Sequence, residues 1–490
     1  MRKGLLIVLA VTLVAVLAAP AMADVNLNGF YRAKGYVTNF ENPGTAPTVG
    51  NASNQGEPPT AAYVEQRMRL RFSAGDENVK AIAFFEIDFS AWGDTAGGVP
   101  VAVGTSTYTG GAQRNSGGAL GGDRINLETK NVYVWFKVPN TSVDFTVGLQ
   151  NQTDAYYGLI YGTADMAAIF ANFKVEPMTF TLGWAKLYEN QVNKTDDLTL
   201  YVAAANFVPT KDVKLGLNLY ALQIDASKSP NCTATSGALP VCFPAAGVPA
   251  LSPGSKAWIW TPGINFAAGA GPATLSGFLI YNWGEYESIT GGQGTDIRGY
   301  AVDLRGDVKV GPGNFFLEGL YVSGGDDPNK YESIVTLSDV NSSPGGNSAF
   351  VRMDYSILMN NADDINTNTC LIGCAAPATL GASSPGNGGR GMWTIGTGFS
   401  MKLAEKTTGK IGAGYLQAVK MRPTDPSYKG ESMGIEVNAN VNHNIYKGLD
   451  FGLYGAYAWL GDFYTYQTTP GSTNDPDPAY DLHFRLNYAF

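Results

Sequence analysis

Three arginines, Arg67, Arg69 and Arg71, alternate with apolar residues and form the sharpest chemical feature of the sequence. Alternate residues of a β-strand point to the same face, so these guanidinium groups share one side of a strand. Arginine costs a few kcal/mol at the middle of a bilayer, so this side must contact water. Arg32 and Lys34 extend the set onto the preceding polar–apolar alternation. Such a positive surface can orient dipolar solutes and bias the passage of ions.

Acidic residues on the following strand could neutralise part of this charge. A turn centred at 76–77 predicts Arg67 opposite Glu86 and Glu65 opposite Asp88. One interpretation is a salt-bridged wall that keeps the structure rigid. The other interpretation is that the basic residues without an acidic residue opposite them create an electric field across the interior. These basic residues are Arg69, Arg71, Arg32 and Lys34.

The elements that position these residues show period-two alternation from residue 24 to the end, with little helical periodicity. Short turns such as 139–141 and 311–314 alternate strictly with long polar segments such as 93–124 and 324–391. Short turns at one rim and long loops at the other are typical of a transmembrane β-barrel, and a sandwich has no reason to keep that asymmetry.

Counting strand centres predicts an all-β fold, a transmembrane antiparallel β-barrel of about eighteen strands. The segment 324–391 is the least regular part of the pattern. Residues 348–359 within it alternate and could form a hairpin, so sixteen to twenty strands remain possible. We expect one domain, residues 24–490, with short periplasmic turns and long extracellular loops.

Residues 1–23 are predicted to be a secretory signal peptide. Arg2 and Lys3 precede an apolar run, and residues 21–23 form a small-x-small cleavage site. The chain has a formal net charge of −9 at pH 7, which argues against nucleic acid as a partner.

The four cysteines form two short pairs, Cys232 with Cys242 and Cys370 with Cys374. In an oxidising compartment they are most simply interpreted as two local disulfides. A zinc site is the weaker interpretation because neither pair has a nearby histidine, and we expect no metal.

Enzymatic motifs are absent from the sequence: it has no G-x-S-x-G, no Walker loop and no H-E-x-x-H. His443 and His483 are both expected near the short-turn ends of their strands, away from the outer rim where barrel hydrolases need a histidine. No haem-attachment motif occurs, so we expect neither catalysis nor a cofactor.

The sequence resembles the outer-membrane porins of Gram-negative bacteria. The resemblance rests on the leader, the first strand at 25–39, the alternation, and a terminal aromatic pair, Tyr488 and Phe490. It implies a location in the outer membrane, contact with its lipid and lipopolysaccharide, and a terminal signal read by the barrel-assembly machinery. Monomer and homotrimer both remain open.

Porins of the general type also fold their third long loop inward to narrow the channel, and here 151–166 has that ordinal position. The Pro-Glu-Phe-Gly-Gly motif of the enterobacterial loop is missing from the sequence. A barrel of eighteen strands resembles substrate-specific porins or alginate-export-type channels more than it resembles the sixteen-stranded general porins. The residues of interest in this loop are Asp154, Tyr156, Tyr157, Tyr161 and Asp165. The two aspartates could face basic residues across the channel, or they could be solvated surface charges. The three tyrosines could form an aromatic surface along which sugars move, or they could belong to the aromatic belt at the membrane interface.

The resemblance implies a water-filled channel for passive diffusion of small hydrophilic solutes and ions. The alternatives are a substrate-specific channel or exporter for an anionic substrate, and a structural or adhesive surface barrel. Tryptophans near predicted strand ends are interpreted first as a membrane-interface girdle. These are Trp92, Trp184, Trp258, Trp260, Trp283 and Trp459.

Overall fold

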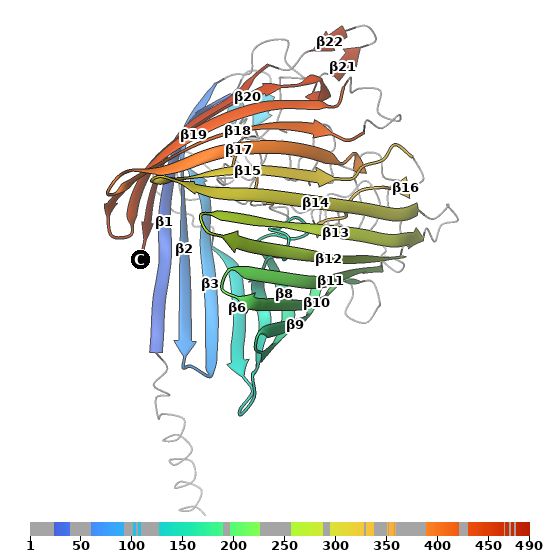
Figure 1. Ribbon diagram of the computed structural model, residues 1–490. Coiled ribbons are helices and arrows are strands. Elements are labelled where there is room, and N and C mark those ends of the chain that lie inside the picture. The colour runs from blue at the N-terminus through green and yellow to red at the C-terminus, as the bar shows by residue number, and fades with distance from the viewer. Residues whose placement is uncertain are drawn as a thin grey trace, which may run out of the picture.

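The computed structural model describes most of the chain as one closed sheet (Figure 1). The described residues are 24–39, 60–92, 101–103, 106–108, 127–189, 197–225, 256–287, 295–327, 330–337, 350, 352–356, 358, 389–420, 430–464, 466–469, 472–474 and 477–490. The four cysteines and the predicted signal peptide lie outside them. Within the described residues, no helix is long and apolar enough to cross a membrane.

Eighteen antiparallel strands form the wall, and the sheet closes because β1 pairs with both β2 and β23. The first nine are β1 (Asp24–Thr38), β2 (Ala61–Gly75), β3 (Val79–Ala91), β6 (Leu127–Lys137), β7 (Val143–Gln152), β8 (Ala164–Val175), β9 (Met178–Glu189), β10 (Asp197–Thr210) and β11 (Val213–Asp225). The others are β12 (Lys256–Ala270), β13 (Ala273–Glu287), β14 (Thr295–Val310), β15 (Gly313–Val322), β17 (Met392–Ala404), β18 (Thr407–Ala418), β19 (Ser432–Tyr446), β20 (Leu449–Leu460) and β23 (Ala479–Ala489). The predicted fold and strand number are confirmed.

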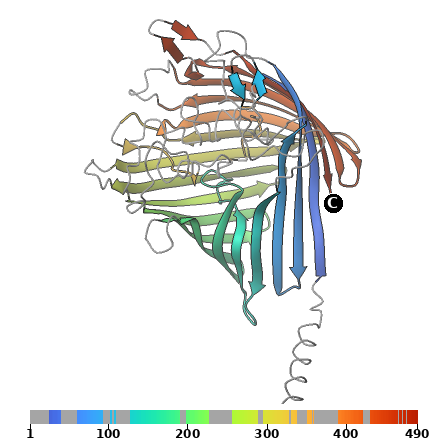
Figure 2. The ribbon, with the colours of Figure 1, turned by 180° about the vertical axis from the view of Figure 1, so that it is seen from behind.

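Two short hairpins are separate from the sheet that forms the barrel wall. The hairpin of β21 (Tyr466–Thr469) and β22 (Ser472–Asn474) projects beyond the long-loop rim, as Figure 2 shows from behind. A second small hairpin joins β4 (Val101–Val103) and β5 (Ser106–Tyr108).

The predicted register between β2 and β3 is wrong by two residues. Arg69, rather than Arg67, lies opposite Glu86. The reason is the turn, where Asp76 Oδ1 accepts hydrogen bonds from the backbone N–H groups at 78 (2.7 Å) and 79 (3.0 Å). These bonds lower the pKa of Asp76, and they move the turn toward β3. A shift of two keeps every side chain on its predicted face, because the period of a strand is two.

A second register difference lies farther along the same pair. The pairing shifts between Gln66 and Met68, so Glu65 lies opposite Ala91 instead of Asp88. A shift of this kind is a β-bulge or a similar irregularity, which no turn rule can place from the sequence.

The sequence left open a hairpin within the long segment 324–391. The described residues of 348–359 form no strand, and residues 352–356 and 358, here called the inner segment, lie against the inner face of the wall. The one strand between β15 and β17 in the described part is β16 (Lys330–Tyr331), which pairs parallel to β14. The alternating side chains of this segment therefore pack against the inner face of the wall and do not add a strand to it.

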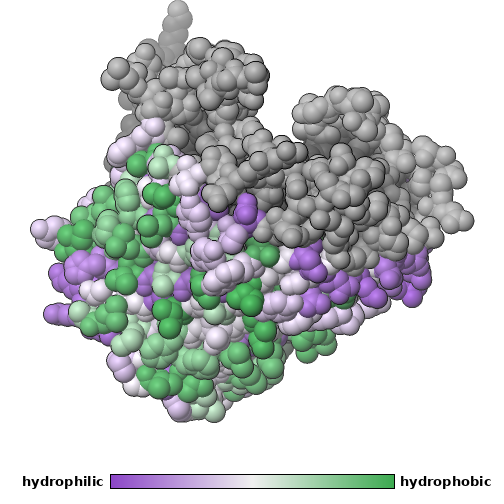
Figure 3. All heavy atoms as spheres, turned by 90° about the horizontal axis from the view of Figure 1, so that it is seen from above, coloured by the Kyte–Doolittle hydropathy of each residue, from purple (hydrophilic) through white to green (hydrophobic). Residues whose placement is uncertain are grey.

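The two faces of the wall differ as the alternation predicts. Outward-facing apolar residues such as Leu217, Leu304 and Ile411 are 50–63% exposed, and the wall facing the viewer in Figure 3 is largely apolar. Inward-facing neighbours such as Asn218 and Asp303 are polar and buried. An apolar outer band around a polar interior is the arrangement of a membrane barrel.

Tryptophans ring the long-loop rim on the outer face. Trp184, Trp258, Trp283 and Trp459 are 41–50% exposed near the ends of their strands. Trp258 also stacks on Tyr201, with ring centroids 5.8 Å apart. Exposed aromatic rings at this height are typical of a membrane interface.

Deleting Phe490 should lower the amount of folded barrel. Its N–H and C=O exchange two hydrogen bonds with Gly29 (3.0 and 2.9 Å), which complete the closure between the two ends of the sheet. Losing both should cost about 2 kcal/mol, at about 1 kcal/mol each. Heat-modifiable migration on gels measures the folded fraction. Tyr446→Ala, which removes an aromatic ring at the same rim, is the control. A deletion variant with the wild-type folded fraction would refute the expectation.

Candidate functional site

The predicted bases lie together on the inner face of β1 and β2. Lys34 and Arg67 are 1% and 5% exposed. Across the strand pair, Lys34 lies opposite Glu65 and Arg32 lies opposite Arg67. The hydroxyl of Tyr36 donates to Glu65 Oε1 at 2.8 Å. The first two strands therefore present a mixed, mainly positive inner wall.

Glu86 neutralises more of this wall than the predicted register allowed. It forms an ion pair with Arg69, and its Oε2 lies 3.5 Å from Arg67 Nε. Lys130 Nζ lies 4.0 Å from the other oxygen. The expectation that Arg69 has no acidic partner is wrong. The side chain of Asp88 lies outside the described residues.

Arg71 differs from its neighbours on β2. Its Nη2 donates to the hydroxyl of Tyr133 at 3.3 Å, and no carboxylate within the described ranges forms an ion pair with it. The side chain is exposed to the lumen. Of the predicted set on β2, Arg71 is the base most exposed to the lumen.

The third long loop packs against the inner side of the wall. Residues 153–163 link β7 to β8 and are largely buried. Asp154 organises the loop, because its Oδ1 accepts from the N–H groups of Tyr156 and Gly158 and its Oδ2 from those of Ile160 and Tyr161, at 2.6–3.0 Å. Burial raises the pKa of Asp154 to about 6, and the four amide donors act in the opposite direction. This carboxylate therefore holds the loop rather than facing the passage.

Two of the loop tyrosines pack closely against the wall. Tyr156 and Tyr161 are 0% and 3% exposed and contact the ring of Tyr220 on β11 edge to face. Asp165, at the end of the loop, pairs with Lys130 Nζ at 2.8 Å. A role for Asp165 as the acidic side of a constriction stays a prediction.

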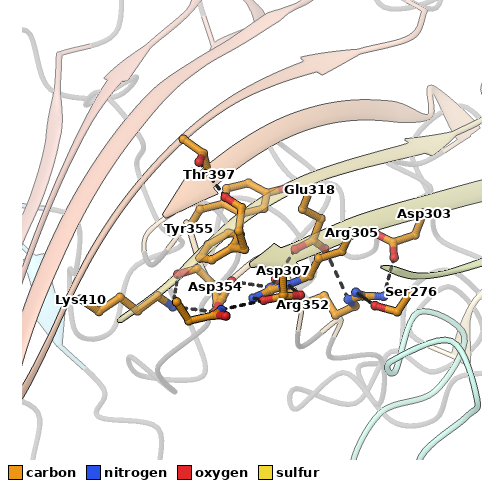
Figure 4. Close-up of polar contacts among 12 residues, drawn as sticks. Ser276, Asp303, Arg305, Asp307, Glu318, Arg352, Asp354, Tyr355, Thr397 and Lys410 are labelled. Carbon is orange, nitrogen blue, oxygen red and sulfur yellow. Dashed lines mark hydrogen bonds and ion pairs between the residues drawn. The ribbon is translucent and has the colours of Figure 1, made fainter. Parts of the chain in front are cut away.

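The largest polar cluster was missed by the sequence analysis, and it fixes the inner segment to the opposite wall (Figure 4). Arg352 Nη1 lies 2.7 Å from Asp303 Oδ1, and its Nη2 donates to Ser276 Oγ at 2.7 Å. Its Nε lies 3.9 Å from Glu318. The guanidinium also covers the ring of Tyr157 at 4.1 Å, which joins the inner segment to loop 153–163.

A second ionic contact holds Asp354 of the inner segment. Its carboxylate lies 3.0 Å from Arg305 Nη1 on β14 and 2.7 Å from Lys410 Nζ on β18. Arg305 also pairs with Glu318 at 3.0 Å and Asp307 at 2.9 Å. Charges from three strands thus converge on one short segment.

Tyr355 shows why the inner segment fits this part of the wall. A Cβ at Gly396 or Gly414 would lie 2.2 or 2.4 Å from its ring, and one at Gly412 would lie 3.0 Å from its Cα. Only a wall without side chains can receive the ring there. Its hydroxyl hydrogen bonds Thr394 Oγ1 at 3.0 Å.

The sequence contained two signals for this cluster. Asp303, Arg305 and Asp307 alternate on one face of β14, as the arginines of β2 do. Alternate glycines recur at 396–398 and 412–414 on neighbouring strands, which marks a surface for close approach. Neither signal says which distant segment fills the surface.

The expected place of His483 is wrong, because it lies nearer the long-loop end of β23 than the short-turn end, opposite Tyr36 on β1. It is 1% exposed, its ring stacks on Tyr454 with centroids 4.6 Å apart, and its Nδ1 hydrogen bonds Asp481. His443 lies beside the short turn after β19, as expected. Among the described residues, no group of three or more His, Cys, Asp or Glu side chains could hold a metal ion.

No protein-family model and no curated protein matches the chain. Solved structures do. A BenF-like porin from Pseudomonas fluorescens Pf-5 matches with TM-score 0.51 at 11% identity, over 95% of this chain and 98% of that chain. Pseudomonas aeruginosa OccK2 (OpdF) matches with TM-score 0.51 at 10% identity, and OccK8 (OprE) with 0.50 at 11%, both over 95% and 98% of the two chains. The chain therefore has a porin fold.

Replacing Arg352 by Met should release the inner segment from the wall. The variant leaves the buried carboxylates of Asp303 and Glu318 without this partner, and breaking a buried ion pair from one side costs about 3–5 kcal/mol. We expect cleavage of the inner segment by added protease, measured by mass spectrometry of the fragments. Lys410→Met, which removes a more exposed partner, should have a smaller effect. A protease pattern equal to that of the wild type would contradict this account of the docking.

Proposed function

We propose that the protein is a passive, water-filled channel for small hydrophilic solutes in the outer membrane of a Gram-negative bacterium. The observation that carries the proposal is the closed barrel with an apolar outer wall and a charged inner wall. A water-filled passage requires a polar inner wall, and a barrel of about this many strands is wide enough to enclose one. The porin fold of the solved relatives supports the same function.

The inner wall would act on solutes through its uneven charge. The bases of β1 and β2, of which Arg71 has no carboxylate partner among the described residues, would attract anions and orient dipoles. The cluster around Arg352 is internally paired and would contribute little field at a distance. The expected result is a weak preference between ions.

A substrate-specific channel is the second candidate. The specific observation for it is that loop 153–163 and the inner segment both occupy the lumen and are fixed there by buried contacts. A rigid, shaped passage selects among solutes, whereas an open one selects only by size.

The proposal also covers export of the chain, its assembly into the membrane and its contact with lipid. Residues 1–23 would direct export, and Tyr488 and Phe490, exposed at the short-turn rim, would present the signal for the barrel-assembly machinery. The tryptophan girdle would lie among lipid and lipopolysaccharide head groups. Assembly as a homotrimer is a further part of the proposal.

Planar-bilayer recording tests the function directly. A general diffusion channel should give stable ohmic steps that no single solute blocks. A specific channel should show block by one class of solute. A barrel without stable conductance would contradict the proposal and favour a structural or adhesive role.

Arg71→Gln should move the reversal potential in a salt gradient toward cation preference. A unit charge about 8 Å from an ion in water contributes about 0.5 kcal/mol, which physiological salt reduces to about 0.2 kcal/mol. The contribution has opposite signs for cations and anions, so the ratio of their permeabilities should change about twofold. Lys402→Gln, which removes an exposed lysine near the short-turn end of β17, is the control. An unchanged reversal potential would mean that Arg71 has only a structural role.

A further inference from the structure

A cavity of about 400 Å³ lies between loop 153–163 and the wall formed by β7 to β12. Loop residues such as Thr153 and Ala155 form one side of it, and wall residues such as Asn172 and Asn206 form the other. These two asparagines lie within a few residues of the short turns that end β8 and β10. The cavity therefore occupies the half of the lumen nearer the short turns. Its volume is in the range of sites for small molecules.

The lining of this cavity is polar but almost without charge. Asp154, the one carboxylate among the described lining residues, already accepts four backbone hydrogen bonds. None of these lining residues is a lysine, arginine or histidine. Amides and hydroxyls, which both donate and accept hydrogen bonds, supply the rest of the polar surface. They are Thr146, Gln152, Thr153, Asn172, Thr181, Asn206, Asn218 and Asn265.

Asn218 provides an independent sign of a missing partner. The side chain is 2% exposed, and its Nδ2 donates to Asn265 Oδ1 at 2.8 Å. Its Oδ1 and the neighbouring hydroxyl of Tyr156 are both buried, and among the described residues neither makes a hydrogen bond of good geometry. A hydroxyl group entering the cavity would give Asn218 Oδ1 a better-placed donor.

The aromatic rings add the second element of such a site. Phe170, Tyr161 and Tyr220 line the same cavity and present apolar surface between the amides. A sugar has hydroxyl groups at its rim and C–H groups on its faces, so a mixed lining of amides and rings matches it.

The cavity next to this one suits anionic solutes better. An adjoining cavity of about 290 Å³ shares Thr146 and Gln152 with it and is lined by Arg71 and Lys80. An anion in the amide-lined cavity would lose hydration without gaining a positive charge beside it. In the adjoining cavity the anion would lie near the two positive charges of Arg71 and Lys80. The two cavities thus offer different solutes different surfaces.

We propose that the amide-lined cavity is a binding subsite for neutral polyhydroxylated solutes, the chemistry of small sugars and polyols. Anionic solutes pass along the adjoining basic cavity. The inference rests on the proposed channel function, because a solute must enter the lumen to reach the subsite.

Glucose and gluconate are suitable probes, since they differ mainly in one carboxylate. Each is titrated against the ion current of single channels, and the fractional block gives an apparent dissociation constant. In the double variant Asn206→Leu with Asn218→Leu, the constant for glucose should rise at least about fivefold, the loss of one net hydrogen bond. The constant for gluconate should change much less. Asn206→Leu alone, at a partly exposed position, gives the same direction if the double variant folds poorly.

Asn440→Leu is the matched control, because Asn440 lies on the inner face of β19 and does not line the cavity. An unchanged glucose constant in the Asn206 variants, or an equal rise in the control, overturns the subsite. If the wild type shows no channel current, the channel function fails. Saturation-transfer NMR of glucose with the same proteins then tests the cavity by itself, and equal signals from wild type and variants overturn it.

Discussion

The structure depends on one constraint, that every backbone N–H and C=O group within a hydrocarbon layer must find a partner in the protein. A closed sheet meets it, and here the closure is made between β1 and β23, the first and last strands of the wall. Closure in turn forces the two-residue alternation, because one face of each strand meets lipid and the other meets the lumen. The apolar outer band and the inward arginines are both results of this one requirement.

The lumen has its own organisation, and it is asymmetric. One side contains the bases of β1 and β2, among which Arg71 is exposed. The other side is filled, because Asp154 folds loop 153–163 and Arg352 fixes the inner segment. Buried charges are costly unless paired, and each of these charges has partners of good geometry. The passage for solutes is accordingly shaped by segments that are not part of the wall.

The sequence predicted the wall well and its contents poorly, for physical reasons. Alternation and turn residues are local, so all eighteen expected strand centres lie within strands. The register of β2 on β3 failed because Asp76 bonds the turn backbone. The alternation at 348–359 left a further hairpin possible, because packing against an inner wall also favours alternation. The anchors of the inner segment, such as Asp303 for Arg352, are 49 residues away, and no local pattern encodes such a pairing.

The most direct test of this account is the environment of neighbouring positions on β2. Single cysteines would replace Arg71 and Phe72 in a background without the four native cysteines, and each would be treated with a charged, membrane-impermeant thiol reagent. The account predicts rapid labelling at 71 and very slow labelling at 72, with the reverse order for quenching of an attached fluorophore by brominated lipid. Equal labelling at the two positions, or labelling only at 72, would contradict a water-filled lumen behind an apolar wall.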